Sequence, residues 1–304
     1  MEQPFSGLEF AAIVFNILVG IVLPILLAVL IKKKYNMRIG PLFVGACAYI
    51  GTNMFLQGIV DTVVYMIVPL ANFFVEHAMP RAIFFAILHG CVQLGGYYLI
   101  MQMFMKDFRR KENSLLFGVG VRIIDSVMAY GISSGVNLLI FAISMNSQGF
   151  DSYLAGLGNE NIEENRVALE GMVQTSFGDI ISVGCIGLCL MFMTIAVSVL
   201  IFQAAKRQGK NYLLPTAGAV CVLNCLFMEL YSAGIITSVV TCIVLLALLA
   251  VLSCILAYFV YKNDEDEERG KADIVIEAKK APEEMSMRER IARVSKSSPA
   301  SKEE

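Results

Sequence analysis

The stretch LEFAAIVFNILVGIVLPILLAVLIKKK, residues 8–34, decides the fold class of this chain. Its first 24 residues contain a single charged side chain, that of Glu9, and three lysines follow them directly. About 20 apolar residues in a helix cross the hydrocarbon core of a bilayer. A helix also satisfies its own backbone groups, as a segment in lipid must. No basic residue precedes the stretch, so it indicates a retained first spanning helix and not a cleaved signal peptide.

The rest of the chain repeats this pattern. The composition is 57% hydrophobic and 16% charged, whereas soluble domains carry about 25% charged residues. Further spanning segments are expected at 41–66, 82–104, 114–143, 176–204, 213–231 and 235–261. The sequence therefore predicts an all-α, polytopic transmembrane helix bundle with about seven spanning helices. Six or eight are also compatible with it, because the second and fourth segments are rich in glycine and polar residues and the fourth could break near 131–135.

Charge divides the chain into two regions. We expect a transmembrane helical domain at 1–261 and a mostly disordered, charged tail at 262–304, which holds 12 acidic and 10 basic residues. Residues 285–296 have the pattern of a basic amphipathic helix, although a solvated tail is favoured. Alternate connections between the spans carry 11 and 2 basic residues. The positive-inside rule then predicts a multi-pass protein of the cell membrane with its N-terminus outside and its tail in the cytoplasm.

Ionisable residues within the spans are the best functional clues, because a charge at the centre of a bilayer costs about 2.5–3.5 kcal/mol on insertion scales. The candidates are Asp61, His89, Arg122, Asp125, Asp179 and Glu229. Arg122 and Asp125 are three residues apart, so they share a helix face. Either an ion pair between helices or a polar site in a water-filled cavity would account for them. The candidate polar site comprises Arg122, Asp125, His89 and Glu229.

Metal and cofactor chemistry has little support in the sequence. His77 and His89 are the only histidines, whereas a hydrolytic zinc site normally uses three protein ligands. Two cysteine pairs, Cys185/Cys189 and Cys221/Cys225, have helical i,i+4 spacing, but apolar packing is the favoured role for cysteine in a membrane helix. The chain has neither a P-loop nor a basic–aromatic patch for nucleic acid. No cofactor or metal is expected, and membrane lipid is the expected partner.

Several segments together carry a family resemblance. They are 17–34 with Pro24, PLFVGA at 41–46, LLFGVG at 115–120, Asn137 with 143–146, and IAVSVLIF at 195–202. In this order and spacing the chain resembles the YhfC family of membrane peptidases, which are related to CAAX-processing glutamic intramembrane proteases of bacterial and other membranes. The resemblance covers about 17–261, nearly the whole membrane part, and it implies the fold of that family.

The resemblance also implies a catalytic set, and this chain departs from it. The family uses a Glu-Glu pair and an Arg on the third span, a Gly-His-Gly-Gly-x-Glu motif on the fourth, and later histidines. The matching positions hold Val92, Gln93, Gly96, Val121, Thr194 and Cys221, and only a carboxylate survives, as Asp125. The resemblance therefore favours a catalytically degenerate relative, a pseudoenzyme that binds lipid, another membrane protein or a transmembrane helix.

Two alternatives stay open, so the sequence does not decide whether the chain is an enzyme. The first is an active intramembrane peptidase with a relocated site that uses Asp125, Glu229, His89 and cysteines. Zinc would be a cofactor in that case alone. The second is a small-solute or ion transporter that uses Arg122, Asp125 and Asp61.

Overall fold

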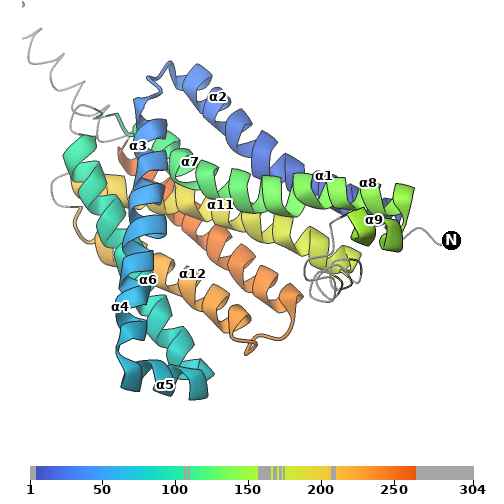
Figure 1. Ribbon diagram of the computed structural model, residues 1–304. Helices are drawn as coiled ribbons and strands as arrows, with labels where there is room; N and C mark the ends of the chain where they lie inside the picture. Colours follow the sequence, from blue (N-terminus) through green and yellow to red (C-terminus); the bar gives the residue numbers. More distant parts are fainter. Residues whose placement is uncertain are drawn as a thin grey trace, which may run out of the picture. The chain divides into compact units, whose positions relative to one another are not determined.

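The fold is that of a helical membrane bundle. The computed structural model describes residues 5–105, 108, 110–156, 166, 170, 173, 175–206 and 210–264 (Figure 1). These residues form helices and connecting turns, with no strand among them. Seven helices in this part of the chain are long and apolar enough to cross a membrane. The prediction of an all-α bundle with about seven spanning helices is therefore confirmed.

Three of the spanning helices contain a π-helical stretch. The first consists of α1 (Gly7–Ile17), η1 (Leu18–Val22) and α2 (Leu23–Tyr35). The second consists of α3 (Gly40–Tyr49), η2 (Ile50–Leu56) and α4 (Gln57–Met66). The fourth consists of α7 (Asn113–Asp125), η3 (Ser126–Asn137) and α8 (Leu138–Gln148). The π-helical turn is wider than an α-helical turn, so it changes which side chains share a face.

The other spanning helices are more regular. They are α6 (Ala78–Phe104), α11 (Phe177–Lys206), α12 (Leu213–Ser232) and a last helix, Val239–Asp264. Two short helices, α5 (Val68–Glu76) and α9 (Phe150–Gly156), follow the second and fourth spans. The fourth span does not break at 131–135, since η3 keeps the backbone helical there. The turn expected at 232–234 is a longer connection, 233–238. The stretch around 162–169, which could form a short surface helix, lies outside the described residues except for Arg166, and so does 285–296, for which a solvated tail is favoured over an amphipathic helix.

The helix α11 is at the centre of the bundle. Within its apolar window 67% of the residues are buried, against 33% or less for each of the other spans. It packs against α1, α6, α7 and α12 (Figure 1). The polar side chains of Ser198 and Gln203 on this helix are fully buried. Most side chains of α11 therefore contact neighbouring helices. A polar side chain on this helix is in the right place to line a site inside the bundle.

Glycines allow α3 and α7 to pack closely. A side chain at Gly45 of α3 would collide with the carbonyl oxygen of Phe117, and one at Gly120 of α7 would collide with that of Leu42. Small residues at helix–helix contacts let backbones approach in this way, which gains dispersion contacts where lipid offers no hydrophobic driving force. This reciprocal contact sets the distance between the helices that carry Tyr49 and Arg122.

Candidate functional site

Arg122, Asp125, Tyr49 and Tyr130 form one polar cluster, which we call the α7 cluster. Arg122 Nη1 lies 2.7 Å from Asp125 Oδ2. The Tyr49 hydroxyl on α3 donates to Asp125 Oδ1 at 2.9 Å, and Arg122 Nη2 donates to the Tyr130 hydroxyl at 3.3 Å. The side chains of Arg122 and Asp125 are only 13% and 20% exposed. The shared helix face expected from their spacing is thus present, and the hydrogen bond from Tyr49 to Asp125 joins α3 to α7.

The π-helical stretch η3 brings Tyr130 to this cluster. Tyr130 is eight residues beyond Arg122. At 3.6 residues per turn, eight residues of α-helix would turn it about 80° away from Arg122. The wider turns of η3, which begin at Ser126, rotate each residue less and return Tyr130 to the same face. The Arg122 guanidinium lies 5.8 Å from the Tyr130 ring centroid, within range of a cation–π contact.

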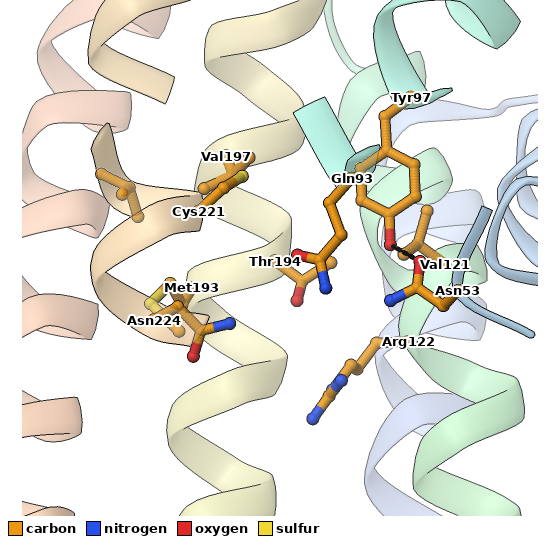
Figure 2. A pocket seen from close by; sticks show the side chains of 11 residues that line it. Asn53, Gln93, Tyr97, Val121, Arg122, Met193, Thr194, Val197, Cys221 and Asn224 are labelled. Carbon is orange, nitrogen blue, oxygen red and sulfur yellow. Dashed lines mark hydrogen bonds between the residues drawn. The ribbon is translucent and has the colours of Figure 1, made fainter. Parts of the chain in front are cut away.

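A small cavity adjoins the α7 cluster, and we call it the intramembrane cavity (Figure 2). Its volume is about 30 Å³, enough for about two water molecules. It is lined from η2, α6, α7, α11 and α12 by Asn53, Gln93, Tyr97, Val121, Arg122, Met193, Thr194, Val197, Val220, Cys221 and Asn224. The lining is rich in amides and hydroxyl groups, unlike the lipid-facing surface of the bundle.

Some of these polar groups have partners and some have none. The Tyr97 hydroxyl donates to Asn53 Oδ1 at 2.8 Å, and the Thr52 hydroxyl donates to the same oxygen at 2.9 Å. Among the described residues, neither Arg122 Nε nor Asn224 Oδ1 has a hydrogen-bond partner, although both atoms are buried. Figure 2 shows the Arg122 and Asn224 side chains directed toward a common space. One donor and one acceptor are therefore unsatisfied within the same cavity.

Positions that the family resemblance matched to catalytic residues meet in this cavity. Gln93, Val121, Thr194 and Cys221 come from four helices, and all four line it (Figure 2). Gly96 lies one turn from Gln93 on α6, and a side chain there would collide with Thr52. Val92 is half-buried and is not part of the lining. Four positions that the resemblance matched to catalytic residues therefore lie around one cavity.

A second polar cluster centres on His89 of α6, and we call it the His89 cluster. His89 Nε2 lies 2.7 Å from Asp61 Oδ1 of α4, and His89 Nδ1 lies 3.3 Å from Glu229 Oε1 of α12. The imidazole is 9% exposed and the carboxylates are 33% and 27% exposed. A neutral imidazole carries only one N–H. Both carboxylates can be hydrogen-bonded at once only if the cluster holds an additional proton, on the ring or on a carboxyl group.

The sequence analysis placed His89 and Glu229 in one candidate site with Arg122 and Asp125. In the structure, Arg122 and Asp125 pair with each other, whereas His89 lies between Asp61 and Glu229. Asp61 bonds to His89, and Asp179 caps the start of α11 through Ser176.

The sequence did not single out five polar residues of the sites: Tyr49, Asn53, Tyr97, Tyr130 and Asn224. They are uncharged, so hydropathy does not distinguish them from other polar residues in a span.

The described residues contain no group of three or more His, Cys, Asp or Glu side chains arranged to hold a metal ion. All eight cysteines are free thiols, including Cys185, Cys189, Cys221 and Cys225. In the His89 cluster the two carboxylates bind different ring nitrogens, so they do not converge on one point. In the intramembrane cavity, Cys221 is the one side chain of a type that commonly binds zinc.

Comparison with known proteins places the chain in a family. A family model described as YhfC intramembrane metalloprotease matches residues 19–282. The chain is 27% identical over 249 residues to the uncharacterized membrane protein YhfC of Bacillus subtilis (strain 168), which covers 80% of this chain and 93% of that relative. No solved structure matches it. Because the family model spans most of the membrane part and extends into the tail, the chain belongs to the YhfC intramembrane metalloprotease family.

Proposed function

We propose that this chain is a non-cleaving member of its family, which binds a polar group of a membrane partner or a lipid in the intramembrane cavity. One observation carries the proposal. The cavity is lined by Gln93, Val121, Thr194 and Cys221, which occupy positions matched to catalytic residues of the family. Hydrolysis needs a group that accepts a proton from water and groups that stabilise the oxyanion. An amide, a methyl-branched side chain and a hydroxyl group do not accept that proton near neutral pH.

The family description implies a metal ion, and the cavity does not fit one. Catalytic zinc normally has three protein ligands drawn from histidine, cysteine and carboxylate side chains. The lining offers one thiol, three side-chain amides and two hydroxyl groups, together with the guanidinium of Arg122. A buried guanidinium repels a cation, and amides are weak ligands for zinc. We therefore assign no hydrolytic step to this cavity.

The unsatisfied atoms of the cavity favour a ligand group that both accepts and donates hydrogen bonds. Leaving a buried donor or acceptor without a partner costs about 1–3 kcal/mol. Arg122 Nε and Asn224 Oδ1 are two such atoms. A backbone amide or a headgroup with neighbouring carbonyl and hydroxyl groups would pair with both. A volume of about 30 Å³ admits one such group, so the remainder of the ligand would lie between helices or in the surrounding lipid.

A peptidase assay tests the absence of cleavage. The purified full-length protein is incubated with transmembrane and prenylated peptides, with zinc supplied, and no turnover is expected. Turnover that disappears in Asp125→Asn would overturn the proposal and restore the peptidase hypothesis. Asp125→Asn is the right variant for this assay because Asp125, on α7, is the carboxylate that the family resemblance matches to the motif of the fourth span.

Retention of co-purified lipid or peptide, measured by native mass spectrometry, tests the binding part. Asn224→Leu removes the unpartnered acceptor and fills the cavity, so retention should fall. Asn137→Leu is the matched control, because Asn137 is exposed and lies outside the lining. Equal retention in both variants would contradict binding at this site.

A proton-linked or ion transporter is the second candidate, and the His89 cluster is the observation that favours it. The His89 imidazole of α6 lies 2.7 Å from a carboxylate of α4 and 3.3 Å from a carboxylate of α12, within a spanning region. Such chains of carboxylates and histidines serve as relays in pumps and transporters. Uptake of a solute or ion by proteoliposomes that is abolished by His89→Gln or Asp125→Asn would favour this function over binding alone.

A further inference from the structure

An apolar groove is bounded by α2, α7 and the start of α3, and we call it the α2 groove. Its volume is about 220 Å³. The helix α7 packs against both α2 and α3, whereas Figure 1 shows α2 and α3 diverging from the turn that joins them. No residue that lines the groove also lines the intramembrane cavity. The groove is therefore a separate feature, at the end of the first span that carries the three lysines.

One face of α2 forms a wall of this groove. Ile25, Ala28, Val29 and Lys32 all line it, and their spacing of three, four and seven residues places them on one side of the helix. Ala28 is buried, and so is Leu116 on the facing side of α7, whereas Ile25 and Val29 are about half exposed. The floor is thus closed by helix packing, and the rim is open toward lipid.

The lining is apolar except at one end. Lys32, in the last turn of α2, is its only charged or polar residue. The volume is below the range of small-molecule sites, about 300–1,000 Å³, so the groove admits a segment of a hydrocarbon chain better than a compact ligand. Every spanning helix exposes apolar side chains to lipid. What distinguishes this surface is a concave shape with a cation at one end.

Further cations gather around the Lys32 end. Two more lysines and Arg38 follow Lys32, and all of them are exposed. Arg110 Nη2 donates to the carbonyl oxygen of Tyr35 at 3.2 Å, which brings another guanidinium to the same turn. Arg110 Nε lies 3.4 Å from Glu112 Oε2, and this carboxylate offsets one of the charges. The groove therefore ends in a region of net positive charge.

The start of α3 adds a second attraction for an anion at this end. Ile39 lines the groove and is the N-cap residue of α3, and no side chain caps the helix there. The Met37 N–H donates to the carbonyl oxygen of Lys32 at 3.1 Å, so the turn returns the chain toward α2. The first N–H groups of a helix and its dipole favour a negatively charged group such as a phosphate.

We propose that the α2 groove binds an anionic phospholipid, with one acyl chain along the apolar lining and the phosphate at Lys32 and the start of α3. An ammonium group offers three hydrogen-bond donors to phosphate oxygens. A zwitterionic headgroup brings a cation of its own, which the neighbouring Lys33 and Arg38 would repel. The groove should therefore prefer a headgroup with a net negative charge, as basic pockets between spanning helices do.

Lipid titration followed by native mass spectrometry of the full-length protein tests this preference. Phosphatidylglycerol and phosphatidylcholine with identical acyl chains are added separately to the protein in detergent. The salt concentration is about 0.15 M, where charges more than about 8 Å apart are largely screened. We expect the first phosphatidylglycerol to bind about fivefold more tightly, which corresponds to the contribution of one lysine near an anionic surface. Equal affinity for the two lipids would overturn the proposal.

Two neighbouring lysines separate a defined site from diffuse attraction. Lys32→Gln should remove the preference for phosphatidylglycerol, because Lys32 is the cation of the lining. Lys33→Gln is the matched control, since Lys33 is the next residue of the same helix, is exposed and does not line the groove. It should change the preference less than twofold. An equal loss in both variants would show that the basic cluster acts only through its total charge, which contradicts the proposal.

A third variant tests the seat of the acyl chain. Ala28→Leu fills the floor of the groove and should weaken phosphatidylglycerol binding, whereas Gly51→Leu adds bulk at an exposed position with no atom within 4 Å and should not. Thermal melts show whether Ala28→Leu is folded, and the lysine variants test the site if it is not. Unchanged binding by folded Ala28→Leu would contradict the proposal. A dimer that disappears in Ala28→Leu would assign the groove to a second copy of the chain instead.

Discussion

Arg122 and Asp125 lie one turn apart on α7 and form an ion pair with 2.7 Å between Arg122 Nη1 and Asp125 Oδ2. The remaining carboxylate oxygen accepts a hydrogen bond from the Tyr49 hydroxyl of α3 at 2.9 Å. Both oxygens of Asp125 are therefore occupied, one within its own helix and one from a neighbouring helix. The pair can hold α3 against α7, and it also contributes a guanidinium to the wall of the intramembrane cavity.

A double-mutant cycle is expected to reveal this coupling. Asp125→Ala alone leaves a buried guanidinium without its carboxylate, which costs about 3–5 kcal/mol for a buried pair. Adding Arg122→Ala should recover part of this loss, because it removes the unpaired charge. Thermal melts in detergent with a thiol-reactive dye measure the effects. Arg166 and Glu170 form an exposed i,i+4 pair at 3.0 Å and serve as the control, with a coupling of at most about 0.5 kcal/mol. Simple additivity at Arg122 and Asp125 would argue against direct coupling.

Replacing His89 should destabilise the bundle far more than replacing His77. His89→Ala leaves the Asp61 and Glu229 carboxylates without the imidazole that separates them. His77 is exposed, and its Nδ1 interacts with the carbonyl oxygen of Phe73 at 3.0 Å, so His77→Ala should change stability by about 0.5 kcal/mol or less. The two melting curves give the comparison. Adding Asp61→Asn to His89→Ala should restore stability, and its failure to do so would show that charge repulsion is not the cause.

Two glycines of α6 should respond in opposite ways to alanine. A Cβ at Gly90 would lie 2.6–2.8 Å from Val222 of α12, so Gly90→Ala must push the two helices apart beside His89. Gly95 has no atom within 4 Å of its Cβ position, and Gly95→Ala should be neutral or stabilising by up to about 1 kcal/mol. Thermal melts of both variants measure this difference. Equal midpoints for the two variants would mean that the close approach of α6 and α12 is not required.

Zinc binding should be gained when family-type ligands are restored to the intramembrane cavity. Gln93→Glu, Val121→His and Thr194→His together place a carboxylate and two imidazoles on α6, α7 and α11 around one space. Metal analysis of the purified triple variant is expected to give about one zinc per chain, against none for the unaltered protein. In the control variant, Gly95→Glu replaces Gln93→Glu, so the carboxylate lies outside the lining of the cavity. A triple variant that folds and takes up no zinc would show that these side chains do not converge.

The asymmetry of 11 to 2 basic residues in the connections predicts an orientation in the membrane with the N-terminus outside and the tail in the cytoplasm. A reporter fused after Glu304 should be active in the cytoplasm, and one inserted between α9 and α11 should be active outside. Reversing the charge of Lys32, Lys33 and Lys34 should weaken this orientation, because they flank the first span. A cytoplasmic signal from the insertion between α9 and α11 would reverse the predicted topology.

The local properties of the spans follow from the sequence alone. Apolar stretches of about 20 residues predict the spanning helices, and the seven expected segments correspond to the seven observed ones. The spacing of Arg122 and Asp125 predicts their shared face, since three residues make nearly one helical turn. These features depend on hydropathy and helix geometry within one segment, so they can be derived before any helix packing is known.

Contacts between helices were decided by the tertiary structure. Arg122 and Asp125 pair with each other and with Tyr49, whereas His89 pairs with Asp61 and Glu229, and no sequence pattern separated these two groups. Lipid is as apolar as a leucine side chain, so the interior and exterior faces of a spanning helix differ little in hydropathy. Which faces of the helices meet then depends on close contacts at glycines such as Gly90 and on the wide turns of η3. For that reason the wall formed by Gln93, Thr194 and Asn224 exists only once α6 and α12 have packed against α11.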